Sequence, residues 1–241
     1  MVLNGDLGAG KSTVAILLAA RLGVRRISVG DLYRAMAADR GMTALQLNLH
    51  AELDDKIDHY VDQLQADIAA SGEQVVVDSR LAWHFFTDAV KVHLITDPSV
   101  AARRVLGRPA DTVESYASAE EARRRLAVRS ESERVRFLTR YGADKTRLRN
   151  YDLVCDTTRA TPEEIVERII AYLEEPPDGV PRPLCQLDPH RIRSAPAGDR
   201  PEPIAVRCTP PGFVLVDGRR PLDAAIRADR TLIAATLVDE E

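Results

Sequence analysis

Short apolar runs alternate with longer stretches of helical periodicity along the first 175 residues of the chain. The apolar runs are rich in valine and isoleucine, which favour strands. Strands separated by helices need crossover connections, and these produce a mainly parallel sheet with helices on both faces. The predicted strands are Val2–Asn4, Arg26–Val29, Gln74–Asp78, Val90–Thr96 and Leu153–Asp156.

Apolar residues spaced three and four positions apart predict helices between these strands. The expected helices are Lys11–Leu22, Asp31–Arg40, Leu53–Ala70, Pro98–Leu106, Ala119–Tyr141 and Pro162–Leu173. The predicted fold class is therefore α/β, with a parallel sheet covered on both faces.

The pattern changes at Pro176, where the chain becomes rich in proline. Proline donates no backbone hydrogen bond, so clustered prolines argue against a helix or a central strand. We therefore expect a first domain at residues 1–175, and a proline-rich linker with a small α+β domain at residues 176–241. In the second domain, we expect strands at Phe213–Val216 and Leu232–Val238, and a helix from Pro221 to about Ala228.

Composition is that of an ordinary globular protein, with 45% apolar and 29% charged residues in 241. The net charge of −4 argues against nucleic acid or an anionic membrane as a partner. No apolar run predicts a membrane span, and no signal peptide is recognisable, so we expect a cytoplasmic protein. The three cysteines lie far apart, and we expect free thiols and no metal site there.

The most specific motif is GDLGAGKS, which occupies Gly5–Ser12 between a predicted strand and a predicted helix. It matches the phosphate-binding P-loop pattern G-x-x-x-x-G-K-[ST]. Its glycines allow backbone conformations that turn successive amide N–H groups toward an anion, and the helix adds its positive end. We expect ATP phosphates to be bound by Gly5, Gly8, Ala9, Gly10, Lys11, Ser12 and Thr13.

A magnesium ion is expected beside this loop. Ser12 offers a hydroxyl ligand, and Asp78 ends the apolar strand VVVD, where a carboxylate of P-loop folds supports the metal. ATP and Mg²⁺ are therefore the predicted cofactors. The motif alone does not separate a kinase from an ATPase or a GTPase.

Arginines in three later segments suit a phosphorylated acceptor, since a guanidinium group binds two phosphate oxygens at once. Asp31 is expected to cap a helix that carries Arg34 one turn later, and Arg80 follows Asp78 by two residues. Arg129 and Arg136 are seven residues apart and share one face of a long helix. For each arginine taken singly, a solvated surface charge is the alternative.

The order G-x-x-x-x-GKST, S-x-GDLYR, DSRLAW, R-x-x-SE-x-x-R-x-x-x-x-YG and YDLV-x-DTT resembles the cytidylate kinase family, in its short archaeal-type and actinobacterial form. The resemblance covers nearly all of residues 1–175. It implies the nucleoside monophosphate kinase fold, MgATP as donor, and CMP or dCMP as acceptor. It further implies that Arg34 and Arg80 hold the acceptor phosphate, with Asp31 and Asp78 beside it. Lys11, Arg34, Arg80 and the lid arginines Arg129 and Arg136 would form the catalytic set.

Two features depart from the family pattern. Ser79 stands where relatives carry glycine, and the aromatic run LAWHFF follows it, in which Trp83, His84, Phe85 and Phe86 either pack in the core or stack on a base. A modified nucleotide or another small metabolite is therefore an alternative acceptor. A nucleotide-sensing regulator is a third hypothesis.

Residues 184–238 resemble a small ParB-like domain, the fold shared with sulfiredoxin, through LCQLDPHRIR, PEPIAVR and GFVLVDGRRPLDAAIRA. Gly218, Arg219 and Arg220 match part of that family's phosphate-binding segment, but Pro221 and Asp223 depart from it. A structural or oligomerising module is the alternative to nucleotide binding, so a homo-oligomer formed through this domain is possible.

Overall fold

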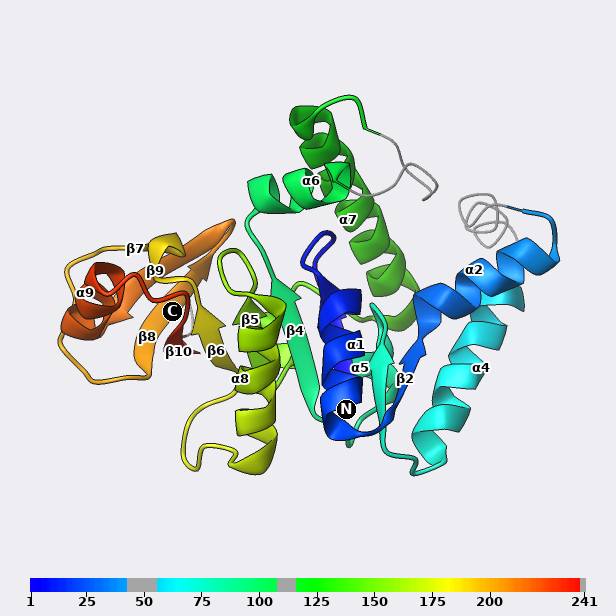
Figure 1. Ribbon diagram of the computed structural model, residues 1–241, viewed down its shortest axis with the longest axis horizontal. Coiled ribbons are helices and arrows are strands. Elements are labelled where there is room, and N and C mark those ends of the chain that lie inside the picture. Colours follow the sequence, from blue (N-terminus) through cyan, green and yellow to red (C-terminus); the bar gives the residue numbers. More distant parts are fainter. Residues whose placement is uncertain (43–55, 108–115, 239–241) are drawn as a thin grey trace.

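The computed structural model describes residues 1–42, 56–107 and 116–238. Within these ranges, one sheet has the strand order β2-β3-β1-β4-β5-β6-β10-β8-β9-β7 (Figure 1). The strands are β1 Val2–Gly5, β2 Arg25–Ser28, β3 Val75–Asp78, β4 Lys91–Ile95, β5 Leu153–Asp156, β6 Leu184–Leu187, β7 Ile192–Arg193, β8 Ile204–Thr209, β9 Gly212–Asp217 and β10 Ile233–Leu237. The α-helices are α1 Lys11–Leu22, α2 Val29–Asp39, α4 Lys56–Ala70, α5 Ala82–Phe85, α6 Pro98–Leu106, α7 Ala119–Tyr141, α8 Pro162–Glu174 and α9 Arg219–Arg227.

The first five strands are all parallel to their neighbours, as the alternation of strands and helices predicted. Successive side chains of a strand point to opposite faces of the sheet. Leu3 packs against α1 and α8 on one face, while its neighbour Val2 packs against α5 and the end of α4 on the other. The sheet is therefore covered on both faces, with the carboxyl ends of β1 and β3 free to carry the phosphate loop and Asp78.

Local capping explains where the predicted helices begin and end. The side chain of Ser118 caps α7, and Gly142 ends it with a left-handed φ of 64°. Thr161 forms a capping box with Glu164 at the start of α8. The start of α4 as predicted, residues 53–55, lies outside the described residues.

The expectation that Asp31 caps its helix is wrong. The helix α2 begins at Val29, and its cap is Ser28, whose hydroxyl accepts a hydrogen bond from the backbone N–H of Asp31 at 3.2 Å. Serine at the end of β2 is itself a strong cap, so the helix starts two residues earlier. Asp31 lies in the first turn, where its negative charge interacts favourably with the positive end of the helix dipole.

The expectation that the proline-rich segment contains no central strand is also wrong. The strand β6 pairs in parallel with β5 and in antiparallel with β10, so it lies inside the sheet. Pro183 and Pro189 flank β6 without entering it, so its ladder keeps every N–H donor. The proline clusters therefore mark the ends of this strand.

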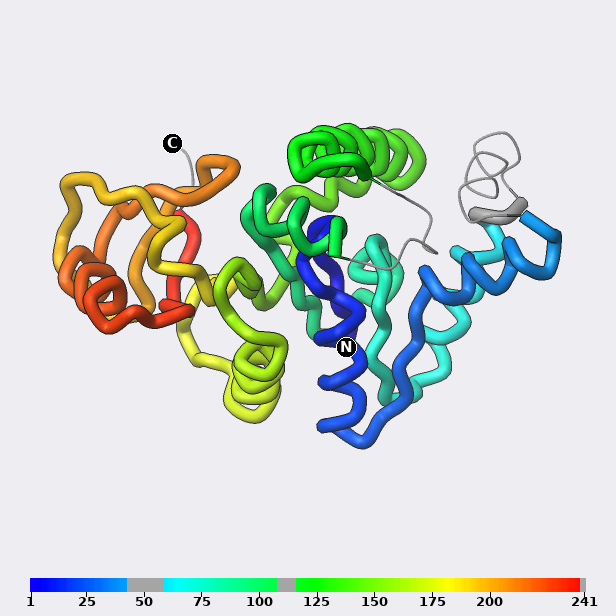
Figure 2. The backbone as a smooth tube through the Cα atoms, turned by 45° about the horizontal axis from the view of Figure 1, so that its top comes forward, coloured from blue at the N-terminus to red at the C-terminus, as the bar shows by residue number. Residues whose placement is uncertain are grey.

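The C-terminal segment, residues 184–237, continues the sheet at one end of an elongated molecule, with α2 and α4 at the other end (Figure 2). Its strand β9, helix α9 and strand β10 occupy the predicted places. Apolar packing crosses the expected boundary at Pro176: Leu232 packs in the cluster of α1 and α8, and Ile95, Tyr151 and Val154 pack with β6 and β8. The division into two domains stays a prediction.

Over the described ranges, none of the helices has the length and apolar character that crossing a bilayer requires.

Candidate functional site

The phosphate loop connects β1 to α1 and presents the first turn of that helix. Gly8 and Gly10 have φ values of 83° and 80°, which glycine adopts without strain. A Cβ at Gly8 would lie 2.8 Å from the Cβ of Ala101, whereas a Cβ at Gly10 would meet no atom within 4 Å. The loop is therefore tightly packed against α6 at Gly8 and open at Gly10, where the N-terminal amides of α1 begin.

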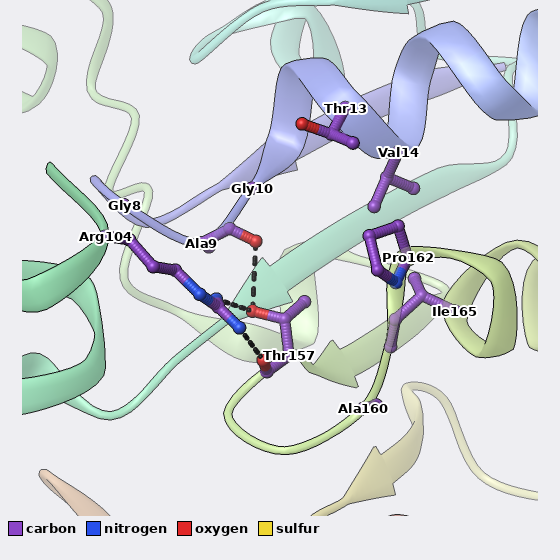
Figure 3. A pocket seen from close by; sticks show the side chains of 10 residues that line it. All are labelled: Gly8, Ala9, Gly10, Thr13, Val14, Arg104, Thr157, Ala160, Pro162 and Ile165. Atoms are coloured by element: carbon purple, nitrogen blue, oxygen red, sulfur yellow. Dashed lines mark hydrogen bonds between the residues drawn. The ribbon is translucent and has the colours of Figure 1, made fainter. Parts of the chain in front are cut away.

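A cavity of about 330 Å³ lies beside this loop (Figure 3). Its walls come from the loop and α1 on one side, and from Thr157, Ala160, Pro162 and Ile165 on the other. Arg104 of α6 closes one edge, and its guanidinium donates to the carbonyl of Thr157 at 2.6 Å and to the hydroxyl at 3.1 Å. The Thr157 hydroxyl donates in turn to the carbonyl of Ala9 at 3.0 Å. Apolar walls and one guanidinium suit a flat aromatic ring.

Lys11 and Asp78 form an ion pair in which both side chains are largely buried. Arg26 donates to the second carboxylate oxygen of Asp78 at 2.8 Å. Burial favours the neutral form of Asp78, but Lys11 and Arg26 outweigh it and hold its pKa below its usual value. Asp78 is therefore an ionised, buried carboxylate beside the phosphate loop.

Arg26 also joins this pair to the predicted acceptor residues. It contacts Asp31 at 3.0 Å, and Asp31 forms an ion pair with Arg34. Arg34 is more than half exposed, so it can change partner at low cost. Four of the predicted residues, Lys11, Asp31, Arg34 and Asp78, thus share one network through Arg26.

A second network surrounds Glu133 on α7. This buried carboxylate pairs with Arg80, with Arg129 at 3.2 Å and with Lys145 at 3.0 Å. Of these three partners, Arg129 lies on the same helix as Glu133, four residues before it. Glu131, in contrast, pairs with Arg134 on the surface of α7 at 2.8 Å.

Lys145 links the second network electrostatically to the rest of the site. Burial lowers the pKa of Lys145 to about 8; Arg80, Arg129 and Arg136 act in the same direction, and Asp6 opposes them. Arg80 also lowers the pKa of Lys11, a smaller effect than that of burial. Arg136 has no ion pair with Glu133 among the described contacts, and its guanidinium lies 5.4 Å from the centre of the adjacent Phe137 ring.

Cationic side chains gather in the two networks. Among the described contacts, Lys11, Arg26, Arg34, Arg80, Arg129 and Lys145 surround the carboxylates of Asp31, Asp78 and Glu133. Such a concentration of cations beside a P-loop suits a polyanion such as a nucleotide phosphate.

Sequence reasoning missed Arg26, Arg104, Glu133 and Lys145. Arg26 had a usable signal. It shares a face of β2 with Ser28, two residues later, and Ser28 lies beside Asp78 at the carboxyl ends of the parallel strands β2 and β3. Arg104 belonged to a predicted helix but carried no motif. Lys145 follows the end of α7 by four residues, and nothing local indicates that it reaches Glu133.

The aromatic run LAWHFF lies mainly against the core, which favours the packing interpretation. Phe86 is buried, and Trp83 packs edge-on against Tyr151 with ring centres 5.7 Å apart. His84 is exposed and touches the rings of Phe85 and Tyr141. Ser79 is buried, and its hydroxyl donates to Gln65 at 3.1 Å.

The partial phosphate motif of the C-terminal segment is occupied by the chain's own carboxylates. The backbone N–H of Arg220 donates to Asp199 at 3.0 Å, and that of Gly218 donates to Asp217 at 2.8 Å. The Arg220 guanidinium pairs with Asp199 at 2.6 Å. These groups are therefore satisfied without a phosphate.

Oxygen donors suited to Mg²⁺ are present at the phosphate loop. Ser12 is exposed at the start of α1, and Asp78 ends β3 within reach of Lys11. Mg²⁺ takes few protein ligands and completes its shell with phosphate oxygens and water. This donor set fits a metal that arrives with ATP.

Known proteins share both the sequence and the fold of this region. A family model described as an AAA domain matches residues 1–138. The cytidylate kinase of Methanobrevibacter smithii is 33% identical over 174 residues, which is 72% of this chain and 98% of the relative. That of Haloquadratum walsbyi is 38% identical over 182 residues, covering 74% of this chain and 92% of the relative. About a quarter of this chain therefore lies outside each alignment.

Solved structures agree on the fold. An uncharacterized protein from Eubacterium ventriosum superposes with a TM-score of 0.52 at 16% identity, over 72% of this chain and 97% of its own. Shikimate kinase from Bacteroides thetaiotaomicron gives 0.50 at 18% identity, over the same shares. Together with the P-loop, the parallel sheet and the sequence relatives, these likenesses establish that the chain belongs to the cytidylate kinase family.

Proposed function

We propose that this protein transfers the γ-phosphoryl group of MgATP to CMP or dCMP. The observation that carries the proposal is the cluster of cationic side chains beside the phosphate loop, which come from β2, from α2, from the segment after β3 and from α7. Phosphoryl transfer needs positioning and charge neutralisation more than covalent catalysis by the protein. The relatives' activity supplies the acceptor class, since they are cytidylate kinases.

The donor is proposed to lie along the loop and α1. The phosphates would meet the N–H groups from Gly8 to Ser12 and the Lys11 ammonium, and the adenine would enter the cavity between Arg104 and Pro162. Lys11 must then exchange Asp78 for a phosphate oxygen. Asp78, paired with Arg26, would keep its charge for Mg²⁺, and the Ser12 hydroxyl would be a further ligand of that ion.

The acceptor phosphate is proposed to bind between the two networks, with Arg34 and Arg80 as its clamps. An oxygen of this phosphate attacks the γ-phosphorus, the bond to the β–γ bridging oxygen breaks, and ADP leaves. Arg129 and Arg136 on α7 would neutralise charge on the transferred group. Glu133 would hold Arg80 and Arg129 until the substrates bind and take over these contacts.

The C-terminal segment keeps its ParB-like interpretation as a hypothesis, supported by the order of β9, α9 and β10. Nucleotide binding there is not proposed, because Asp199 and Asp217 occupy the amides. The two-domain division and oligomer formation through this segment also remain hypotheses. A cytoplasmic location follows from the proposed substrates, since ATP and CMP are cytoplasmic metabolites.

An acceptor panel tests the proposal. The full chain is incubated with MgATP and each of CMP, dCMP, UMP, AMP and GMP, and ADP release is followed by a coupled assay. We expect CMP or dCMP to give the highest kcat/KM. A higher kcat/KM for another acceptor would show that the protein is a kinase with a different substrate. Release of ADP without any acceptor would favour a nucleotide-hydrolysing regulator.

A further inference from the structure

The loop between β5 and α8, residues 157–161, is anchored at its start by a buried ion pair with the C-terminal segment. Asp156 has no exposed surface, and one carboxylate oxygen accepts from the N–H and the hydroxyl of Thr158 at 3.0 and 2.6 Å. The other oxygen accepts from Arg191 at 2.7 Å. Arg191 lies in the C-terminal segment, directly before β7. The turn at Thr158 therefore depends on a cation from a distant part of the chain.

The same loop is held at two further points. The guanidinium of Arg159 donates to the backbone carbonyls of Asp229 and Arg230 at 3.4 and 3.3 Å and pairs with Asp188. At the start of α8, Thr231 donates to Glu164 at 2.9 Å. Every anchoring partner named here belongs to the C-terminal segment.

This loop is also a wall of the cavity beside the phosphate loop. Thr157 and Ala160 line the cavity, followed by Pro162 and Ile165 of α8, as Figure 3 shows. Arg104, on the opposite edge, is fixed by the carbonyl and hydroxyl of Thr157. A shift of the turn at Thr158 would thus move both the wall and Arg104.

Among these anchoring residues, Arg191 should affect the loop most, because it pairs with the fully buried carboxylate of Asp156. Burial raises the pKa of Asp156, while Arg191 and the Thr158 hydrogen bonds oppose the rise. Without Arg191, Asp156 must either take up a proton or turn toward water, because an unpaired buried charge is costly. Either change weakens the turn that Asp156 stabilises.

We propose that the C-terminal segment forms part of the donor-nucleotide site, with Arg191 as a positioning residue that sets the affinity for ATP. The inference rests on the proposed function only in taking ATP as the donor. The segment lies beyond residues 1–138, which the family model matches, and it supports the cavity wall from outside.

The test compares Arg191→Gln with Arg191→Lys and with the matched control Arg193→Gln. Arg193 lies two residues further on and hydrogen-bonds Thr209 inside the C-terminal segment at 3.2 Å. MgADP and MgATP binding to the full chain is measured by calorimetry without an acceptor, so the readout does not depend on which acceptor is used. Kinetics then give KM for ATP and for CMP separately.

Arg191→Gln is expected to raise Kd for both nucleotides about tenfold, while KM for CMP and kcat at saturating ATP stay within about twofold. Arg191→Lys should recover part of the affinity, and Arg193→Gln should bind like the parent. Unchanged nucleotide affinity in a folded Arg191→Gln variant would overturn the proposal, as would an equal rise in KM for CMP.

A second variant guards against failure of Arg191→Gln to fold. Asp229→Asn keeps a residue that tolerates the positive φ of 51° and removes the exposed charge facing Arg159. It is expected to raise Kd for ATP by a smaller factor, about threefold. Nucleotide affinity equal to that of the parent would then overturn the proposal.

Discussion

Glu133 binds three cations that belong to the proposed site, although none of them is near it in sequence apart from Arg129. Such clustering around a buried carboxylate is costly unless each charge is compensated. The cost is clearest at Lys145, where burial and the neighbouring arginines disfavour the charged form and lower the pKa to about 8. Its charge is therefore sensitive to pH near neutrality.

The depressed pKa of Lys145 predicts a pH dependence of activity. Below about pH 8 the ammonium is charged and can aid phosphate binding, and as pH rises through 8 that charge is lost. Since kcat/KM reports the free enzyme, kcat/KM for CMP should fall above about pH 8. Lys145→Arg should remove this fall because arginine stays charged.

Lys145→Met should lower kcat/KM at pH 7 by about tenfold, the loss of one charged hydrogen bond. Lys91→Met is a suitable control, since Lys91 begins β4 at the opposite, amino end of the sheet. A pH profile that is the same for Lys145→Arg and the parent would show that another group titrates near pH 8.

At the scale of elements, the strand–loop–helix unit of β1 and α1 depends on two left-handed glycines with different surroundings. Gly8 is pressed against Ala101 of α6, and Gly23 ends α1 with φ 66° and no atom within 4 Å of an added Cβ. Both positions carry the same backbone strain when substituted, of about 1 kcal/mol. Only at Gly8 would the added Cβ also clash with a neighbour, Ala101.

Gly8→Ala should therefore weaken ATP binding more than tenfold, because α6 or the loop must move to accept the methyl group. Gly23→Ala should cost about 1 kcal/mol of unfolding free energy and leave ATP affinity unchanged. Calorimetric Kd values and thermal melts measure the two effects. Equal losses of ATP affinity in both variants would show that helix stability, not loop geometry, controls the site.

At the scale of the whole molecule, the continuous sheet makes the C-terminal segment a partner of the kinase core. Removing residues 176–241 exposes the edge of β5 and uncovers Ile95, Tyr151 and Val154. Loss of burial at about three apolar side chains is worth several kcal/mol, which corresponds to a Tm lower by roughly 10 °C.

Residues 1–175 should thus remain able to fold, since the relatives are matched along nearly their whole length by about three quarters of this chain. The fragment should also show weaker ATP binding, because it lacks Arg191. Thermal melts and MgATP titration of the fragment measure both. A fragment with the Tm and ATP affinity of the full chain would mean that the C-terminal segment contributes nothing to the core.

The sequence predicts those parts of the fold that depend on local pattern. The P-loop, the first five strands and most helix limits follow from periodicity and from capping residues such as Ser118 and Thr161. The position of β6 could not be predicted, because pairing with β5 depends on a distant strand edge and not on the flanking prolines.

The candidate site divides in the same way. Lys11 and Asp78 were recognisable by motif and by position at a strand end, and they do pair. Glu133 and Lys145 were not, because their contact arises only when the chain after α7 folds back along that helix. Arg191 reaches Asp156 across 35 positions of sequence, a contact that no local pattern indicates.

Transfer of the γ-phosphoryl group to a cytidine monophosphate is tested most directly with ATP labelled in its γ-phosphate. The labelled ATP is incubated with CMP, Mg²⁺ and the full chain, and the products are separated by chromatography. We expect the label to appear in CDP at the rate at which ADP forms, and Lys11→Ala to abolish this transfer almost completely. Label found only in inorganic phosphate, with CMP unchanged, would show that the protein hydrolyses ATP and does not phosphorylate CMP.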